Sequence, residues 1–155
     1  MIEVSQLKEI ESLKEISEEA LSYLAGSLQK RTYQDKDSIF NEGTLGGDLY
    51  LVGSGTVKIT KRAKEGEAQS LGVVNAGGFA GIMTFLSEGG HSANASAQGE
   101  CVLYLLDRND FDRFVEKFPA DAVKIMKLLV GELIDQLRSM NERYIDMVNY
   151  MWRWR

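Results

Sequence analysis

The chain has 155 residues, of which 44% are hydrophobic and 26% are charged, and its formal net charge at pH 7 is -5. This is the size and composition of one soluble domain that can bury a sizeable core, and the acidic balance argues against direct DNA binding. No run of 18 or more apolar residues and no apolar signal-peptide core is present, so we expect a cytoplasmic protein.

The first 30 residues carry two short apolar stripes at helical spacing. These stripes are Leu7, Ile10, Leu13 and Leu21, Leu24, Leu28. Ser17 precedes the second stripe and is a residue type that caps helix N-termini, while Glu18 and Glu19 would lie in the first turn. The pattern predicts N-terminal helices within residues 1–30.

From Thr32 to Asp107 the pattern changes to short runs of β-branched and aromatic residues broken by glycines. Turns at this close spacing, without a long helical pattern between them, predict an antiparallel β-roll or barrel. Cys101 is the single cysteine and lies in an apolar alternating run, so we expect a buried side chain rather than a redox thiol.

A glycine-rich stretch, Gly77-Gly78-Phe79-Ala80-Gly81-Ile82-Met83-Thr84-Phe85-Leu86, is followed five residues later by His91-Ser92-Ala93. Its spacing resembles the phosphate-binding cassette of the cyclic-nucleotide-binding domain family. In that family a Gly-Glu step opens a short helix, and an Arg nine residues later precedes a small residue and an Ala. Here Ile82 stands at the Glu position and His91 at the Arg position. The resemblance extends from Arg31 to near Asn141, through glycine spacing in residues 38–59 and an apolar strand pattern in residues 101–111.

The resemblance implies a ligand site formed by Phe79, Gly81, Ile82, Met83, His91, Ser92 and Ala93. In the family the Arg pairs with the cyclic phosphate and the Glu accepts a hydrogen bond from the ribose. If each charge-assisted bond contributes about 1.5–3 kcal/mol, losing both weakens binding by about two to four orders of magnitude. We therefore expect ordinary cyclic nucleotide affinity to be lost and no cofactor to be bound.

The alternative is a small-molecule receptor whose altered cassette binds a cyclic nucleotide or another anion. Backbone amides from Gly81 to Met83 could still bind an anion at the start of the short helix. If so, we expect affinity to rise as pH falls through about 6–6.5, because His91 then becomes charged.

The C-terminal helix is the second strong signal. Pro119 is compatible with the first helical turn, and apolar residues then recur at alternating steps of four and three. We call the following residues the seam: Met126, Val130, Leu133, Leu137, Met140, Tyr144, Met147, Met151 and Trp154. A helix of roughly 35 residues would be about 50 Å long, too long for so small a roll to cover. We expect homodimerisation through the seam from Val130 onward, and we expect Gly131 to permit close approach of the roll.

The chain ends in Met151-Trp152-Arg153-Trp154-Arg155, for which three interpretations are open. Trp with Arg suits a membrane interface, although five residues supply too little area for stable anchoring. Trp154 can instead continue the dimer seam, with Trp152 beside it. The third interpretation is a surface for another protein, since Trp and Arg are enriched in interface hot spots.

The remaining chemistry-bearing residues do not form a recognisable site. One His and one Cys, 10 residues apart, do not make a metal site, and the Asp and Glu residues follow no catalytic spacing. We therefore predict one domain over residues 1–155: N-terminal helices (1–30), a jelly-roll-like β-roll (31–108) and C-terminal helices (109–155), α+β but mainly β.

The predicted function is a stand-alone, non-catalytic regulatory or interaction module that homodimerises, with an unidentified protein partner also considered. The chain most resembles catabolite-activator-type regulators, which carry a helix-turn-helix domain after the long helix. Here the sequence reaches Arg155 without one. A DNA-binding regulator truncated at this point is a third hypothesis.

Overall fold

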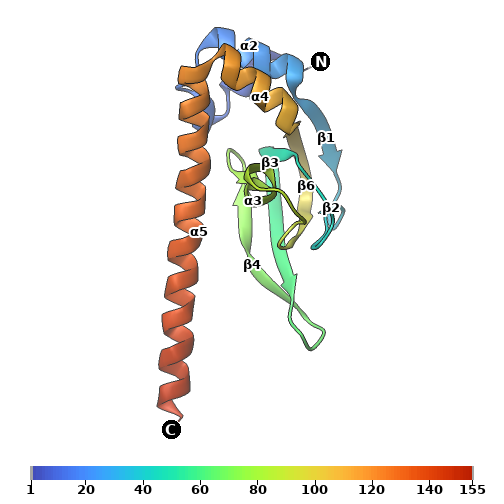
Figure 1. Cartoon of the computed structure of the whole chain (residues 1–155). Coiled ribbons are helices and arrows are strands. Elements are labelled where there is room, and N and C mark those ends of the chain that lie inside the picture. Colours follow the sequence, from blue (N-terminus) through green and yellow to red (C-terminus); the bar gives the residue numbers. More distant parts are fainter. Residues whose placement is uncertain (1, 155) are drawn as a thin grey trace.

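The computed structural model describes residues 2–154 as a rolled antiparallel sheet with short helices at one end and one long helix alongside (Figure 1). The helical elements are α1 (Val4–Lys8), the 3-10 turn η1 (Glu11–Leu13), α2 (Glu18–Ser27), α3 (Ile82–Leu86), α4 (Arg108–Lys117) and α5 (Pro119–Arg153). The strands are β1 (Gln29–Tyr33), β2 (Ser38–Phe40), β3 (Leu49–Arg62), β4 (Ala68–Asn75), β5 (Phe79–Ala80) and β6 (Asn94–Leu106). The predicted fold class is confirmed.

Two long strands, β3 and β6, form the centre of the sheet. The strand order is β1-β6-β3-β4, with β2 added to β6 and β5 added to β3, and every pairing is antiparallel. The register of β3 against β6 shifts around Ser54. Gly55 lies there at φ +81°, and a Cβ at this position would be 2.4 Å from the Glu100 carbonyl oxygen. Glycine is therefore required where the two strands bend together.

Two apolar clusters form the core. One lies within the roll and includes Val52, Val57 and Leu103; the other lies between the sheet and the helices and includes Leu7, Phe114 and Leu129. Cys101 is fully buried in the roll cluster, and burial raises the pKa of its thiol. The expectation of a buried cysteine is confirmed.

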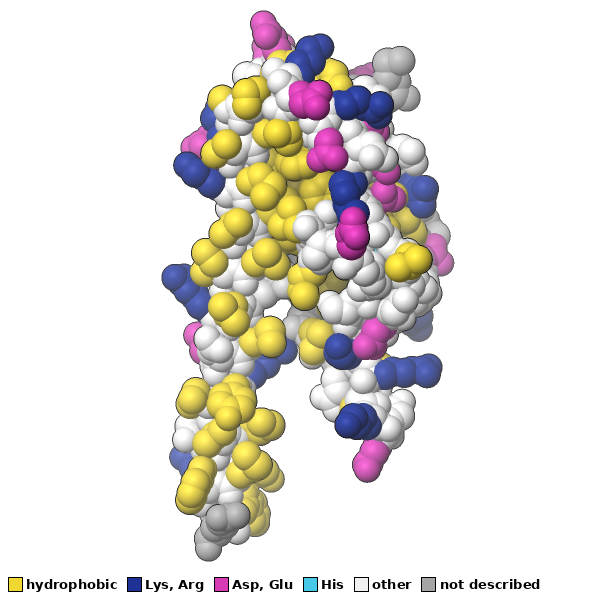
Figure 2. Space-filling view, in the orientation of Figure 1, with side chains coloured by type: hydrophobic (Ala, Val, Ile, Leu, Met, Phe, Trp, Pro, Cys, Tyr) yellow, Lys and Arg dark blue, Asp and Glu magenta, His cyan; other side chains and the backbone are white. Residues whose placement is uncertain are grey.

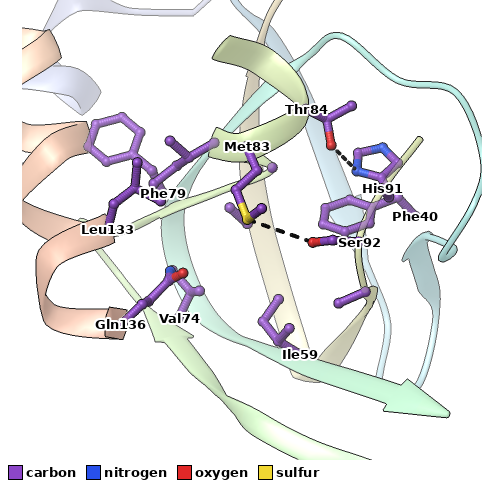
Figure 3. Close-up of a pocket in the computed structure, with 14 residues that line it drawn as sticks. Phe40, Ile59, Val74, Phe79, Met83, Thr84, His91, Ser92, Leu133 and Gln136 are labelled. Atoms are coloured by element: carbon purple, nitrogen blue, oxygen red, sulfur yellow. Dashed lines mark hydrogen bonds between the residues drawn. The ribbon is translucent and has the colours of Figure 1, made fainter. Parts of the chain in front are cut away.

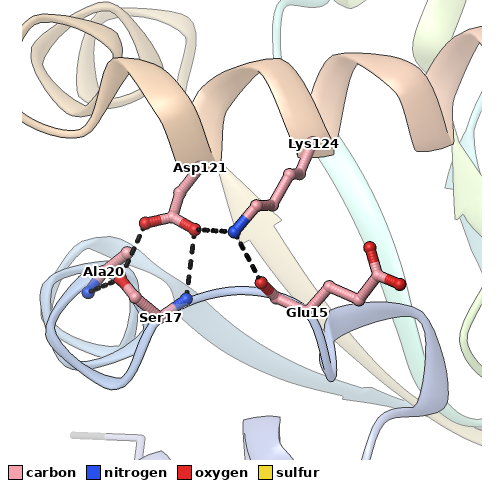
Figure 4. A network of polar contacts seen from close by, with 5 residues as sticks. All are labelled: Glu15, Ser17, Ala20, Asp121 and Lys124. Carbon is pink, nitrogen blue, oxygen red and sulfur yellow. Dashed lines mark hydrogen bonds and ion pairs between the residues drawn. The ribbon is translucent and has the colours of Figure 1, made fainter.

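The N-terminal helices are joined to the first turn of α5 by a polar network (Figure 4). Ser17 caps α2 as predicted, its hydroxyl accepting from the Ala20 N–H at 3.3 Å. The buried Asp121 carboxylate accepts from the Ser17 N–H at 3.1 Å and from the Ser17 hydroxyl at 2.6 Å. Lys124 donates to Asp121 at 3.0 Å and to the Glu15 carbonyl at 2.8 Å. These bonds attach the start of α5 to the opposite end of the chain.

One face of α5 lies against the rest of the domain, and the seam lies mostly outside that face. Ile125 and Leu129 are buried against the helices and sheet, whereas a Cβ added at Gly131 would meet no atom within 4 Å. The expectation that Gly131 permits close approach of the roll is therefore wrong, because this glycine faces open space. Met126 and Leu133 pack partly against the core.

Beyond Leu133 the seam is exposed to solvent. Leu137, Met140 and Tyr144 are 56%, 63% and 61% exposed. Figure 2 shows hydrophobic side chains gathered along α5 and around its far end. Within residues 2–154, the domain itself therefore covers only the start of the seam, at Met126 and Leu133.

Candidate ligand-binding pocket

A tight glycine turn between β5 and α3 forms one wall of a pocket in the roll. Gly81 lies at φ +75°, and a Cβ there would be 2.9 Å from a Tyr50 ring carbon and 3.1 Å from the Asp48 carbonyl oxygen. Both the backbone conformation and the space therefore require glycine. At the other end of α3, Arg108 donates to the Thr84 carbonyl at 2.6 Å and to the Phe85 carbonyl at 3.1 Å. The short helix is held at both ends.

The structure brings all seven predicted site residues to this pocket (Figure 3). The lining residues are Phe40, Ile59, Val74, Phe79, Ala80, Gly81, Ile82, Met83, Thr84, His91, Ser92, Ala93, Leu133 and Gln136. The cavity is only about 80 Å³, whereas pockets for small-molecule ligands usually measure about 300–1,000 Å³. Within residues 2–154, no Lys, Arg, Asp or Glu side chain lines it.

His91 is packed as an aromatic side chain. It is 4% exposed and stacks on Phe40, with ring centroids 3.9 Å apart and planes 10° from parallel. Its Nδ1 lies 3.1 Å from the Thr84 hydroxyl, and a Cβ on Gly46 would be 2.2 Å from its Nε2. Burial lowers the pKa of His91, an effect that Asp48 partly opposes. The pH window of about 6–6.5 expected from the sequence is therefore too high, because the ring stays neutral to lower pH.

Ile82 and Met83 are adjacent in α3, but one side chain is buried in the core and the other is exposed at the pocket. Ile82 is 3% exposed and belongs to the core cluster between sheet and helices. Met83 is 55% exposed, and its sulfur accepts a weak hydrogen bond from the Ser92 hydroxyl at 3.8 Å. Figure 3 shows the Met83 and Ser92 side chains pointing toward each other across the pocket. An apolar side chain and its hydroxyl partner thus narrow the cavity.

The long helix supplies the other side of the pocket, which sequence reasoning did not predict. Leu133 and Gln136 of α5 line it, and the Glu132 carboxylate accepts from the Phe79 N–H at 2.9 Å. Burial raises the pKa of Glu132, although the Phe79 N–H opposes this shift. One turn of α5 is therefore bonded directly to the strand that leads into Gly81. No short motif marks these residues, because their contribution depends on where α5 docks.

The described residues 2–154 contain no group of three His, Cys, Asp or Glu side chains placed to hold a metal ion. Over the same residues, no helix is long and apolar enough to span a membrane.

Comparison with known proteins gives one family. The family model described as "Cyclic nucleotide-binding domain" matches residues 30–118. Among curated proteins, the Cyclic AMP receptor protein of Thermus thermophilus is 35% identical over 114 residues, which are 74% of this chain and 51% of that protein. This chain spans about half the length of the bacterial relatives it matches.

Solved structures agree on the fold. The Catabolite Activator Protein of Thermus thermophilus gives a TM-score of 0.73 at 28% identity, covering 86% of this chain and 62% of that one. A cyclic nucleotide-binding domain from Methylobacillus flagellatus gives a TM-score of 0.79 at 22% identity, covering 93% and 81%. The second likeness establishes similarity of fold only.

Proposed function

Because the chain belongs to the cyclic nucleotide-binding domain family, we propose that it is a non-catalytic regulatory domain with a pocket that has lost ordinary affinity for cyclic nucleotides. The resemblance inferred from the cassette is confirmed by the family match over residues 30–118. The proposal also includes a homodimer formed through α5.

The absence of charge on the described pocket wall carries this proposal. A cyclic nucleotide presents a phosphate anion, yet the lining side chains are apolar or neutral. His91 occupies the cation position, but it is buried, stacked on Phe40 and bonded to Thr84. Burying an anion without a charged partner is costly, and the lining offers only neutral hydrogen-bonding side chains such as Ser92 and Gln136, so the pocket disfavours the ligand. The small cavity volume supports the same conclusion.

The homodimer is supported by the exposed half of the seam. Leu137, Met140, Tyr144 and Met147 are each more than half exposed along one side of α5. A contiguous apolar surface of this kind marks an interaction site in a soluble protein, and the four-and-three spacing is that of a coiled coil.

The deciding experiment is calorimetric titration of the full chain with cyclic AMP and cyclic GMP at pH 7.5. We expect no saturation at tens of micromolar nucleotide. Saturation at one nucleotide per chain in that range would overturn the proposal. The thermal unfolding midpoint gives an independent readout, since a ligand at 100 times its Kd stabilises the folded state by about 2.7 kcal/mol.

The alternative is a receptor for a cyclic nucleotide or another anion, and the descriptions of proteins similar to this chain support it. The Mycobacterium tuberculosis relative is described as a cAMP-activated global transcriptional regulator. Under this alternative, the ligand must enlarge the cavity, and Met83 is the exposed side chain best placed to move. Replacing Met83 by alanine should then raise affinity for cyclic AMP. Unchanged weak binding in Met83→Ala would favour the main proposal.

A further inference from the structure

The far end of α5 exposes more apolar surface than a two-helix seam can cover. Arg143 donates to the Leu71 carbonyl of β4 at 2.8 Å, and residues 144–154 continue past this contact. The exposed large apolar residues there are Tyr144, Ile145, Met147, Tyr150, Met151, Trp152 and Trp154. Figure 2 shows hydrophobic side chains covering most of the visible surface of this segment. We call residues 144–154 the tail.

The arrangement of these residues around the helix is informative. At about 100° per residue, the side chains from Met147 round to Ile145 span about 160° of the helix circumference. A seam for two helices is narrower than this. Ile145 and Trp152 are 55% and 69% exposed, stand seven residues apart on the same face and lie beside the seam rather than on it. Apolar residues beside the seam positions are typical of helices in larger bundles.

The opposite face of the tail is polar. Asp146 and Asn149 lie there, together with Glu142 just before the tail and Arg153 near its end, and all four are exposed. A helix that lies on a lipid surface instead carries mainly Lys and Arg on its polar face. This mixed charge favours a protein partner over a membrane.

We infer that two dimers associate tail to tail, so that the tails of four copies form a four-helix bundle and the protein is a tetramer. The inference rests on the proposed dimer, because the seam must pair two helices before the adjacent faces can meet. Tail-to-tail packing places the two pairs of β-rolls at opposite ends of the assembly, where they cannot collide. Two-fold axes at right angles close such an assembly at four subunits.

The area available is sufficient. Fully burying an aromatic side chain removes about 150–250 Å² from solvent. Ile145 and Trp152 are 55% and 69% exposed, so four copies would bury on the order of 1,000 Å² from these residues alone. Specific interfaces bury about 1,200–2,000 Å², a range reached once part of Tyr144, at the boundary between this face and the seam, is included.

The test is sedimentation equilibrium of the 155-residue chain at tens of micromolar. We expect about four times the protomer mass of 17.3 kDa. The double variant Ile145→Lys, Trp152→Lys should sediment as a dimer. Its matched control, Asp146→Asn with Asn149→Lys, makes the same change in net charge on the polar face and should remain a tetramer.

The outcomes separate this inference from the proposed function. A wild-type dimer would overturn the tetramer and leave the dimer standing, whereas a wild-type monomer would overturn both. A tetramer that persists in the Ile145, Trp152 variant would also overturn the inference, because the contact would then lie elsewhere. Wild-type binding to vesicles of anionic phosphatidylglycerol, lost in the same variant, would assign the tail to a lipid surface instead.

Discussion

Replacing Asp121 by alanine should weaken the attachment of α5 to the N-terminal helices. The carboxylate accepts two hydrogen bonds from Ser17, at 3.1 and 2.6 Å, and one from Lys124 at 3.0 Å. A bond to a charged group contributes about 1.5–3 kcal/mol, whereas the Lys124 pair adds about 0–1 kcal/mol because its side chain is 42% exposed. Since the two Ser17 bonds share one carboxylate, we expect a loss of about 2–4 kcal/mol in the free energy of unfolding.

The assay is urea denaturation at pH 7, followed by circular dichroism, with Asp121→Asn and Ser17→Ala as companions. Asp121→Asn keeps an acceptor oxygen for Ser17, so it should cost about half as much as the alanine variant. In thermal unfolding, the alanine variant should melt about 5–15 °C lower for a domain of this size. A loss within about 0.5 kcal/mol, the usual range for a surface substitution, would refute the assignment.

The same carboxylate gives a signed pH dependence. The Ser17 hydroxyl, followed by the Ser17 N–H and Lys124, holds the pKa of Asp121 below its usual range despite opposition from burial. The unfolded chain therefore binds this proton more readily than the folded chain. The stabilisation is complete above about pH 3.9 and is lost as pH falls through the lower folded pKa. The stability difference between the wild type and Asp121→Asn should narrow below about pH 4.

Three further predictions concern the pocket and the seam. The double change Ile82→Glu, His91→Arg should fail to give micromolar binding of cyclic AMP by calorimetry, and it should also destabilise the fold. The reason is that it buries a carboxylate in the core and breaks the stack on Phe40. Micromolar binding would show that both side chains can turn into the cavity. Burial lowers the pKa of His91, so the wild type should lose stability to urea as pH falls below about 6.5, and His91→Gln should lack this dependence; equal slopes would place the ring in solvent. Leu137→Glu should weaken self-association at least about 30-fold by sedimentation. The exposed half of each Leu137 side chain, one from each protomer, would no longer be buried in the dimer, which removes about 2 kcal/mol of stabilisation. An unchanged mass, or an equal loss in Asn149→Glu on the polar face, would contradict the seam.

The sequence predicts the Gly81 turn of the pocket and the Ser17 cap of α2 because both depend on local backbone chemistry. Gly81 needs a left-handed conformation, and Ser17 needs only a nearby N–H, so spacing and residue type are enough to predict both features. The α5 seam is equally visible, since its period is a property of one continuous segment.

The remaining parts of the site depend on tertiary register. Gln136 and Glu132 reach the pocket region only because α5 docks against β5, and Phe40 reaches His91 only through the pairing of β2 with β6. The pKa of His91 likewise follows from burial, which residue type does not reveal. Sequence spacing therefore locates the residues of the cassette without showing which way their side chains turn.

Three polar contacts along α5 recur at a regular interval. Asp121, Glu132 and Arg143 are 11 residues apart and bond in turn to Ser17 before α2, to β5 and to β4. Eleven residues complete about three helical turns, so all three lie on one face. The first two contacts have buried apolar neighbours, Ile125 near Asp121 and Leu129 near Glu132, whereas Met140 and Tyr144 beside Arg143 are exposed. Detachment of α5 would therefore begin at Arg143 and proceed toward the pocket at Glu132, while the first turns of the helix stay in place.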